Sequence, residues 1–174
     1  MMDCPAVCDL GEDLAPVLGV GCDVVAIPSF RDGMVLPGSR MTDLFSVRER
    51  RQCVALSKAH GDDEIIHLAA RWAGKECVVK AWCAALGDSD FPYAVDGMPW
   101  SRIEILDDRR SVPHVVLGDD VAEALVSGLG RRLSAGSGPI AVRWSPSLSH
   151  DGNRALAFVV LSACRRVSGP QTRV

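Results

Sequence analysis

Two acidic residues lie where the surrounding pattern predicts buried apolar positions. Asp23 interrupts a run of small and β-branched residues in GVGCDVVAI, directly after two glycines. Glu76 comes four residues after Trp72 and three before Val79, so it shares the apolar side of a predicted helix. A bare carboxylate is costly to bury, and each one therefore needs a partner or a cation. Because Mg²⁺ needs only one or two protein carboxylates beside substrate phosphates, this pair is a candidate magnesium site.

Each carboxylate also has a structural interpretation. Asp23 could lie at a strand end and accept backbone N–H groups. Glu76 could pair with Lys80, because oppositely charged residues at i,i+4 are common on helix surfaces and weakly stabilising. The sequence alone leaves both alternatives open.

Basic side chains near Glu76 could bind a phosphate. The chain has only three lysines, and two of them, Lys75 and Lys80, lie within about one helical turn of Glu76. Arg71 precedes them on the same predicted helix. Lysine and arginine donate charge-assisted hydrogen bonds to phosphate oxygens. These residues therefore favour a site that holds a divalent ion and a phosphate together.

His150 ends the run SLSH and is a further candidate. Its structural alternative is a turn histidine bonded to a backbone carbonyl or to Asp151. The neighbouring serines, Ser147 and Ser149, are not predicted nucleophiles, because the chain has no GxSxG elbow. The remaining histidines show no HExxH or similar metal-binding spacing: His60, His67 and His114.

A local excess of arginine stands out in an acidic chain. Arg48, Arg50 and Arg51 fall within four residues, and Arg31 and Arg40 precede them. One interpretation is a solvated helix face. The other is a docking surface for an acidic partner, recruited by charge complementarity.

Composition limits the class of protein. The 174 residues suit a single domain, and 19 Lys+Arg against 22 Asp+Glu give a net charge of −3, which argues against a general nucleic-acid binder. Seven scattered cysteines without a CxxC pair predict free thiols in a reducing compartment. The chain opens without a signal segment, and no apolar run approaches the roughly 18 residues of a membrane span. We therefore expect a cytoplasmic protein with no membrane partner.

The elements that must position these residues follow from periodicity and turn signals. A capping box of Ser46 and Glu49 predicts a helix over 45–58. Asp62 or Asp63 can cap a long helix that Gly87 closes. The other predicted elements are a strand at 17–27, a loop at 31–44, a hairpin of strands 102–106 and 114–117, a helix at 119–129, and final strands at 140–150 and 155–161.

Strands and helices do not alternate regularly along the chain, which predicts an α+β fold with an antiparallel sheet packed on the long central helix. We expect one domain over 17–163, a flexible arm at 1–16 and a flexible tail at 164–174. A glycine- and serine-containing segment at 131–139 is predicted to be a flexible insert.

Taken together, five stretches resemble one family, the holo-acyl-carrier-protein synthases, which are the small trimeric class of 4'-phosphopantetheinyl transferases. The block ARWAGKECVVKAW carries most of the resemblance, because it follows a GxDxV strand and precedes an SxSH strand. The matching stretches are GVGCDVVAIPSF at 19–30, FSVRER at 45–50, HLAARWAGKECVVKAW at 67–82, RIEILDDRRSVPHVVL at 102–117 and SLSHDGNRALAFVVL at 147–161.

The resemblance implies a reaction and its cofactors. Such enzymes move the 4'-phosphopantetheine group of coenzyme A onto a serine of an apo acyl carrier protein and release adenosine 3',5'-bisphosphate, with Mg²⁺. The implied metal ligands are Asp23 and Glu76. The implied coenzyme A contacts are Arg71, Lys75, Lys80, Ser149 and His150. The resemblance further implies a homotrimer with sites between subunits.

The implied chemistry is an in-line attack of the serine hydroxyl on the β-phosphorus, in which positioning and charge neutralisation do most of the work. Lys80 would stabilise charge on the leaving group, and His150 would bind coenzyme A phosphate. Either Glu76 or a metal-held water could take the serine proton, and the sequence does not choose between them. The acidic carrier would dock on Arg31, Arg40, Arg48 and Arg51.

Two other functions fit the same residues. The chain could be a catalytically silent carrier- or nucleotide-binding subunit of a synthase complex. It could also be a magnesium-dependent phosphohydrolase that cleaves coenzyme A without a carrier. The sequence does not distinguish a fatty acid carrier from a polyketide carrier or a fused carrier domain.

Overall fold

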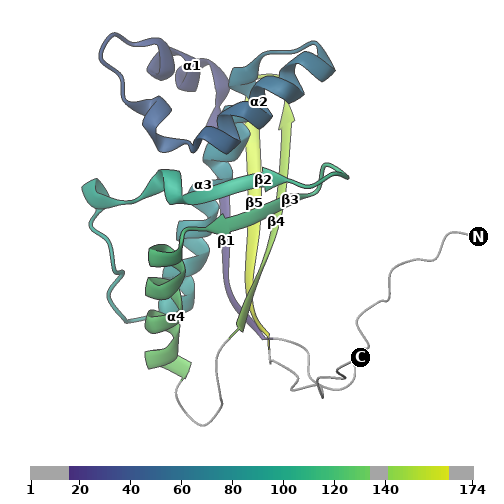
Figure 1. Ribbon diagram of the computed structural model, residues 1–174. Coiled ribbons are helices and arrows are strands. Elements are labelled where there is room, and N and C mark those ends of the chain that lie inside the picture. Colours follow the sequence, from purple (N-terminus) through teal and green to yellow (C-terminus); the bar gives the residue numbers. More distant parts are fainter. Residues whose placement is uncertain (1–15, 134–140, 165–174) are drawn as a thin grey trace, which may run out of the picture.

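A computed structural model describes residues 16–133 and 141–164 of the chain (Figure 1). None of the helices in these two ranges is long and apolar enough to cross a membrane. The elements in chain order are β1 (Val17–Ala26), α1 (Ile27–Val35), η1 (Met41–Leu44), α2 (Val47–His60), α3 (Glu64–Leu86), η2 (Val95–Gly97), η3 (Trp100–Arg102), β2 (Ile103–Asp107), β3 (Pro113–Leu117), α4 (Asp119–Leu133), β4 (Ala141–Asp151) and β5 (Arg154–Cys164).

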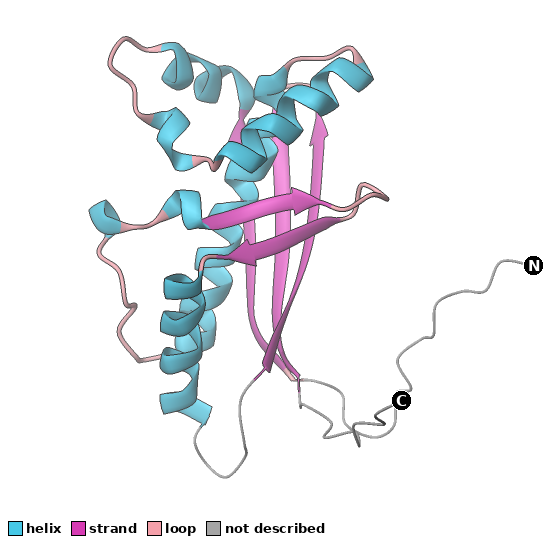
Figure 2. Cartoon of the chain, viewed as in Figure 1, coloured by secondary structure: helices cyan, strands magenta, loops and turns pink. Residues whose placement is uncertain are grey.

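The strands form two antiparallel sheets around the long helix α3. The larger sheet has the order β1-β5-β4, and β2 pairs with β3 in a separate hairpin. Figure 2 shows this hairpin lying across the long strands. Helix α3 packs against β1 and β5, and also against α2, α4 and β2. The prediction of an α+β fold with an antiparallel sheet on a long central helix is therefore confirmed.

Local sequence signals fix both ends of α3. Asp63 is the N-cap, and its carboxylate accepts the backbone N–H of Ile65 at 2.8 Å. Gly87 is the C-cap, with a positive φ of 60° that glycine adopts without strain. Between these caps lie fully buried side chains of the main core, Trp82 among them. The predicted span of the long helix is confirmed.

Two glycines let α3 approach β1 unusually closely. A Cβ atom on Gly19 would lie 2.0 Å from the carbonyl oxygen of Ala81, and one on Gly21 would lie 2.0 Å from that of Cys77. No larger residue fits at either position without moving the helix away from the strand. The two glycines before Asp23 therefore serve helix–strand packing.

The structure corrects the prediction for the segment after β1. Residues 31–44 were expected to form a loop, but α1 occupies Ile27–Val35 and the turn η1 occupies Met41–Leu44. The strand ends at Ala26, and Pro28 lies in the first turn of α1. Proline fits there because the first helical N–H groups have no intrahelical partner.

The capping box and the second half of the chain follow the predicted order. Ser46 accepts the N–H of Glu49 at 3.1 Å, and Glu49 accepts the N–H of Ser46 at 2.9 Å. Helix α4 extends through Leu133, four residues beyond its predicted end, so the first three residues of the expected insert are helical. Cys164 ends β5 instead of starting the tail. The rest of the arm, the insert and the tail lies outside the described residues.

A buried ion pair joins α2, α3 and β2. The side chains of Glu49 and Lys75 are both fully buried, and Lys75 Nζ lies 2.8 Å from Glu49 Oε2. Lys75 also donates to the carbonyl oxygens of Trp100, at 2.8 Å, and of Ile103. Glu49 Oε1 accepts the N–H of Ile105 at 2.9 Å. Burial lowers the pKa of the Lys75 ammonium, and the Glu49 carboxylate opposes that shift.

Removal of one charge from this pair should be strongly destabilising. We expect Lys75→Met to lower the free energy of unfolding by about 3–5 kcal/mol, because Glu49 would stay buried without its counter-charge. The double variant Glu49→Gln/Lys75→Met should recover much of that loss. Urea unfolding followed by tryptophan fluorescence at neutral pH measures all three proteins, and a loss below about 1 kcal/mol for Lys75→Met would contradict the assignment.

Candidate active site

Asp23 and Lys80 come together where β1 passes α3. Lys80 Nζ lies 2.7 Å from Asp23 Oδ1, and it also donates to the carbonyl oxygen of Cys22 at 3.2 Å. The hydrogen bond to Asp23 raises the pKa of Lys80. The side chain of Lys80 is 46% exposed, so its ammonium can also reach a ligand. The sequence left open that Lys80 pairs with Glu76 on the same helix. In the structure Lys80 of α3 pairs with Asp23 of β1 instead.

Glu76 is half-buried one turn before Lys80 on α3. Burial is the main cause that raises the pKa of Glu76, and the negative charge of Asp23 raises it further, while Lys80 opposes the shift. The two carboxylates thus lie near enough to repel each other. Among the described residues Glu76 has no ion pair within 4.0 Å. Asp23 is paired with Lys80 and Glu76 is not paired, and neighbouring carboxylate oxygens of this kind are the donors that Mg²⁺ prefers.

His150 and Ser149 lie on β4, the edge strand of the sheet opposite to the β1 edge that carries Asp23. His150 pairs with Ala155 of β5 in the register of β4, whereas Asp23 pairs with Ala157 from the opposite edge. Both side chains of the SxSH motif are exposed. Within the described residues, no recorded hydrogen bond or ion pair joins His150 to Asp23 or Glu76. One chain therefore brings the carboxylates and Lys80 together but leaves the motif two strands away.

Two predicted phosphate ligands point into the interior. Lys75 is fully buried and donates to Glu49 and two carbonyl oxygens, so the prediction that it contacts coenzyme A phosphate is corrected to a structural role. Arg71 is only 3% exposed and donates to Asp107 Oδ2 at 2.8 Å. Its Nε–H has no partner among the described residues. Arg71 thus keeps one free donor.

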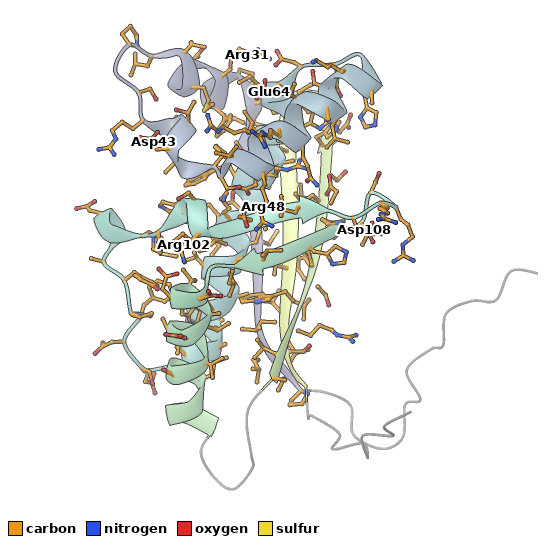
Figure 3. All side chains as sticks on the ribbon, in the orientation of Figure 1. Arg31, Asp43, Arg48, Glu64, Arg102 and Asp108 are labelled. Atoms are coloured by element: carbon orange, nitrogen blue, oxygen red, sulfur yellow. The ribbon has the colours of Figure 1, made fainter. Side chains whose placement is uncertain are left out.

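The arginines predicted to dock a carrier lie on α1, on α2 and in the segment between them, and Figure 3 labels Arg31 of α1 and Arg48 of α2. Three of them have carboxylate partners within the chain: Arg31 with Asp63 at 2.5 Å, Arg40 with Asp43 at 3.2 Å, and Arg48 with Glu104. Arg51 is exposed, and no carboxylate lies within ion-pair distance of it in the described part of the chain. An acidic partner would therefore compete with internal pairs at three of these arginines and meet only Arg51 directly.

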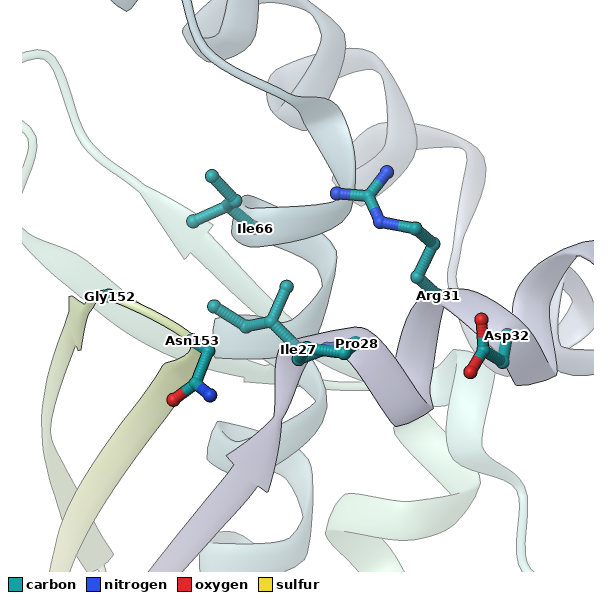
Figure 4. Close-up of a pocket in the computed structure, with 7 residues that line it drawn as sticks. All are labelled: Ile27, Pro28, Arg31, Asp32, Ile66, Gly152 and Asn153. Carbon is teal, nitrogen blue, oxygen red and sulfur yellow. The ribbon is translucent and has the colours of Figure 1, made fainter.

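A shallow pocket of about 250 Å³ lies where α1 meets the β4–β5 turn (Figure 4). Arg31 lines it together with Asp32 of α1 and Asn153 of the turn. The pocket contains neither of the metal-site carboxylates. It lies at the end of the molecule that α1 forms and is distinct from the Asp23–Glu76 site.

The sequence did not reveal the carboxylates that hold the buried cations. Glu49 was recognised as part of a capping box, but its second role as partner of Lys75 depends on tertiary packing. The same holds for Asp107, the partner of the buried Arg71. Glu104, the partner of the exposed Arg48, was not singled out either. His67, which is buried and bonds Asp62, was also passed over. Only the position of Arg71 and Lys75 among the apolar residues of the predicted helix could have signalled such partners.

Comparison with known proteins defines the class. The family described as "4'-phosphopantetheinyl transferase superfamily" matches residues 19–142, so the chain belongs to that superfamily. Within it, a holo-[acyl-carrier-protein] synthase of Bifidobacterium adolescentis is 45% identical over 154 residues, covering 83% of this chain and 99% of that protein. The synthase of Bifidobacterium animalis subsp. lactis is 47% identical over 148 residues, covering 83% and 97%. The chain is thus a transferase of the holo-acyl-carrier-protein synthase family.

Solved structures agree with this placement. The structure named "Chronobacterium ammoniagenes ACPS-CoA complex" is 33% identical, covers 84% of this chain and 98% of its own, and has a TM-score of 0.72. The synthase of Helicobacter pylori in complex with coenzyme A is 21% identical, with a TM-score of 0.54, and supports the fold alone.

The Arg48–Glu104 pair should make stability depend on pH. Burial would raise the pKa of Glu104, but hydrogen bonds from Arg48 and Ser46 and the charges of Arg48 and Lys75 lower it overall. A lowered native pKa stabilises the fold above the ordinary glutamate pKa, and this stabilisation is lost as pH falls through the native pKa. Glu104→Gln should therefore lower stability by about 1 kcal/mol at pH 7, with the difference shrinking below about pH 4.

Urea unfolding of both proteins across acid and neutral pH provides the measurement. Asp43→Asn is the matched control, because its ion pair with Arg40 is exposed and should matter little at any pH. A difference between wild type and Glu104→Gln that stayed constant down to pH 3 would show that charge is not its cause.

Proposed function

We propose that this protein transfers the 4'-phosphopantetheine group of coenzyme A to a serine of an apo acyl carrier protein, with Mg²⁺ as cofactor and adenosine 3',5'-bisphosphate as the second product. The observation that carries the proposal is the constellation of Asp23, Glu76 and Lys80 at the β1–α3 contact. It combines two carboxylates for a divalent ion with an exposed cation for phosphate. The family relatives act on acyl carrier proteins by name.

In this proposal Asp23 and Glu76 hold the ion, which supplies charge neutralisation on the diphosphate when bound. The serine hydroxyl oxygen attacks the β-phosphorus, and the P–O bond toward the adenosine portion breaks with its electron pair. Lys80 stabilises the charge that develops on the departing phosphate. In this proposal Glu76 also accepts the serine proton, through the carboxylate oxygen that does not hold the ion.

The remaining motif residues bind the coenzyme. His150 and Ser149 are exposed and can donate to phosphate oxygens, whereas Arg71 is buried against Asp107 and would have to leave that pair to reach a phosphate. The carrier docks on Arg31, Arg40, Arg48 and Arg51. Acidic carrier side chains would exchange with the internal partners of the first three and meet Arg51 directly.

We further infer a homotrimer whose sites lie between subunits. The face of the large sheet turned away from α3 exposes Val20, Val24, Leu156 and Phe158, each more than 40% exposed. The β1–β5 register places these side chains on neighbouring positions of one face. A contiguous exposed apolar face marks an interaction surface. Assembly through this face would let the SxSH motif of one copy complete the carboxylate site of another.

The reaction belongs in the cytoplasm in this proposal. Four cysteines in the described residues are free thiols: Cys22, Cys53, Cys77 and Cys83. Burial raises the pKa of Cys53 and of Cys77 to about 12, which keeps both thiols protonated and unreactive. Free thiols suit a reducing compartment.

The metal assignment predicts loss of transfer without loss of fold. Asp23→Asn and Glu76→Gln should each lower the transfer rate at least about 100-fold, because each removes one of two protein ligands. Mass spectrometry of an apo carrier incubated with coenzyme A and Mg²⁺ measures the added phosphopantetheine group. The control Asp43→Asn removes an exposed carboxylate and should transfer normally. Normal rates in both site variants would overturn the metal assignment.

The assembly assignment predicts that charge on the apolar sheet face separates the subunits. Phe158→Glu should shift the solution mass from trimer to monomer and abolish transfer, because the SxSH motif would no longer reach a neighbouring site. Light scattering measures the mass. The control Val126→Glu places the same charge on an exposed position of α4 and should stay trimeric. A wild-type protein that is monomeric would refute the assignment.

A further inference from the structure

Three of the four histidines in the chain gather at the corner between α2 and α3. The ring centroids of His60 and His67 are 5.7 Å apart, and those of His67 and His150 are 6.1 Å apart. Asp62 lies between the first two. The proposed transfer reaction uses neither His60, Asp62 nor His67, so this cluster needs its own explanation.

The distances within the cluster suit metal coordination. His67 Nε2 lies 2.8 Å from Asp62 Oδ1, and His60 Nδ1 lies 4.0 Å from Asp62 Oδ2. One ligand atom from each of the three residues falls within 4.8 Å of the others. Ligand atoms about 2.0–2.2 Å from a tetrahedral zinc ion are about 3.3 Å apart. The observed separations lie on both sides of that value, so small side-chain movements would form the site.

The backbone holds two of the three donors in place before any ion binds. Gly61 caps α2 in the left-handed conformation, and its N–H bonds the carbonyl oxygen of Ser57 at 2.8 Å. Ser57 Oγ donates to the carbonyl oxygen of Asp62 at 2.7 Å. The tight turn therefore fixes His60 and Asp62 on one side, and His67 faces them from the first turns of α3.

Solvent reaches the cluster from the side of His60. His67 is 5% exposed, whereas the side chain of Asp62 is 25% exposed and that of His60 is 59% exposed. An ion entering from solvent would thus meet three protein donors and keep its fourth position for water. This count is typical of zinc sites that are not purely structural.

The donor set indicates the class of ion. Imidazole nitrogen suits Zn²⁺ and related transition metals, while Mg²⁺ prefers oxygen donors alone. We propose that His60, Asp62 and His67 form a second metal site that binds a divalent transition ion of the Zn²⁺ class. It is separate from the carboxylate site, because Glu76 lies nine residues after His67, about 13 Å further along α3. The site does not depend on the transfer activity.

Calorimetric titration of the full chain with Zn²⁺, in excess Mg²⁺ to fill oxygen-rich sites, tests the proposal. His60→Ala should bind at least tenfold more weakly than wild type, because an exposed ligand is lost without disturbing the core. His114→Ala is the matched control: its side chain is 53% exposed and lies near one carboxylate, that of Asp108. All three proteins keep the same cysteines, so the difference reports the imidazole. Equal affinity of wild type and His60→Ala would overturn the site.

Zinc-edge anomalous scattering from wild-type crystals gives a second readout that needs no variant. A peak about 2.0–2.2 Å from His60 Nδ1, an Asp62 oxygen and His67 Nε2 is the expected result. Zinc peaks at other positions, with none at this corner, would refute the proposal and leave the His67–Asp62 pair as a purely structural contact.

Discussion

The close packing of α3 on β1 is the constraint on which the site depends. Gly19 and Gly21 leave no room for side chains between strand and helix. Asp23 is the next residue of β1 on the same face of the sheet, and its Oδ1 lies 2.7 Å from Lys80 Nζ. A wider helix–strand spacing would separate the lysine from the aspartate and weaken the repulsion between the two carboxylates. The close contact between the backbones of β1 and α3 thus sets the distances between the charged groups of the proposed catalytic centre.

The positive charges on α3 divide into two groups with opposite functions. Lys75 points into the core and is held by Glu49, whereas Lys80, five residues later, reaches the surface beside Asp23. Five residues on an α-helix correspond to a rotation of about 140°, which separates the two side chains onto different faces. The interior lysine fixes α2 and β2 against the helix. The surface lysine is left for a ligand.

The two ends of α3 serve different purposes as well. Glu76 and Lys80 lie in its second half, beside Asp23 of β1, whereas the His60–Asp62–His67 cluster lies where it begins. Figure 1 shows α1 and α2 at the same end of the large sheet. One end of the molecule therefore carries the predicted docking arginines of α1 and α2, the pocket at Arg31 and the His60–Asp62–His67 cluster. Carrier recognition and metal binding would take place on neighbouring surfaces.

The sequence by itself determined the α+β class, the caps of α2 and α3, and the pairing of β2 with β3, because these depend on contacts within a few residues. It also singled out Asp23, Glu76 and Lys80, since polar residues in apolar runs are visible without coordinates. It missed α1, because a proline that ends a strand can equally begin a helix. Only the tertiary structure decided which lysine and arginine side chains are held inside the protein and which can reach a ligand. Glu49 and Lys75 are 26 residues apart, and no local pattern reports a pairing that long-range packing creates.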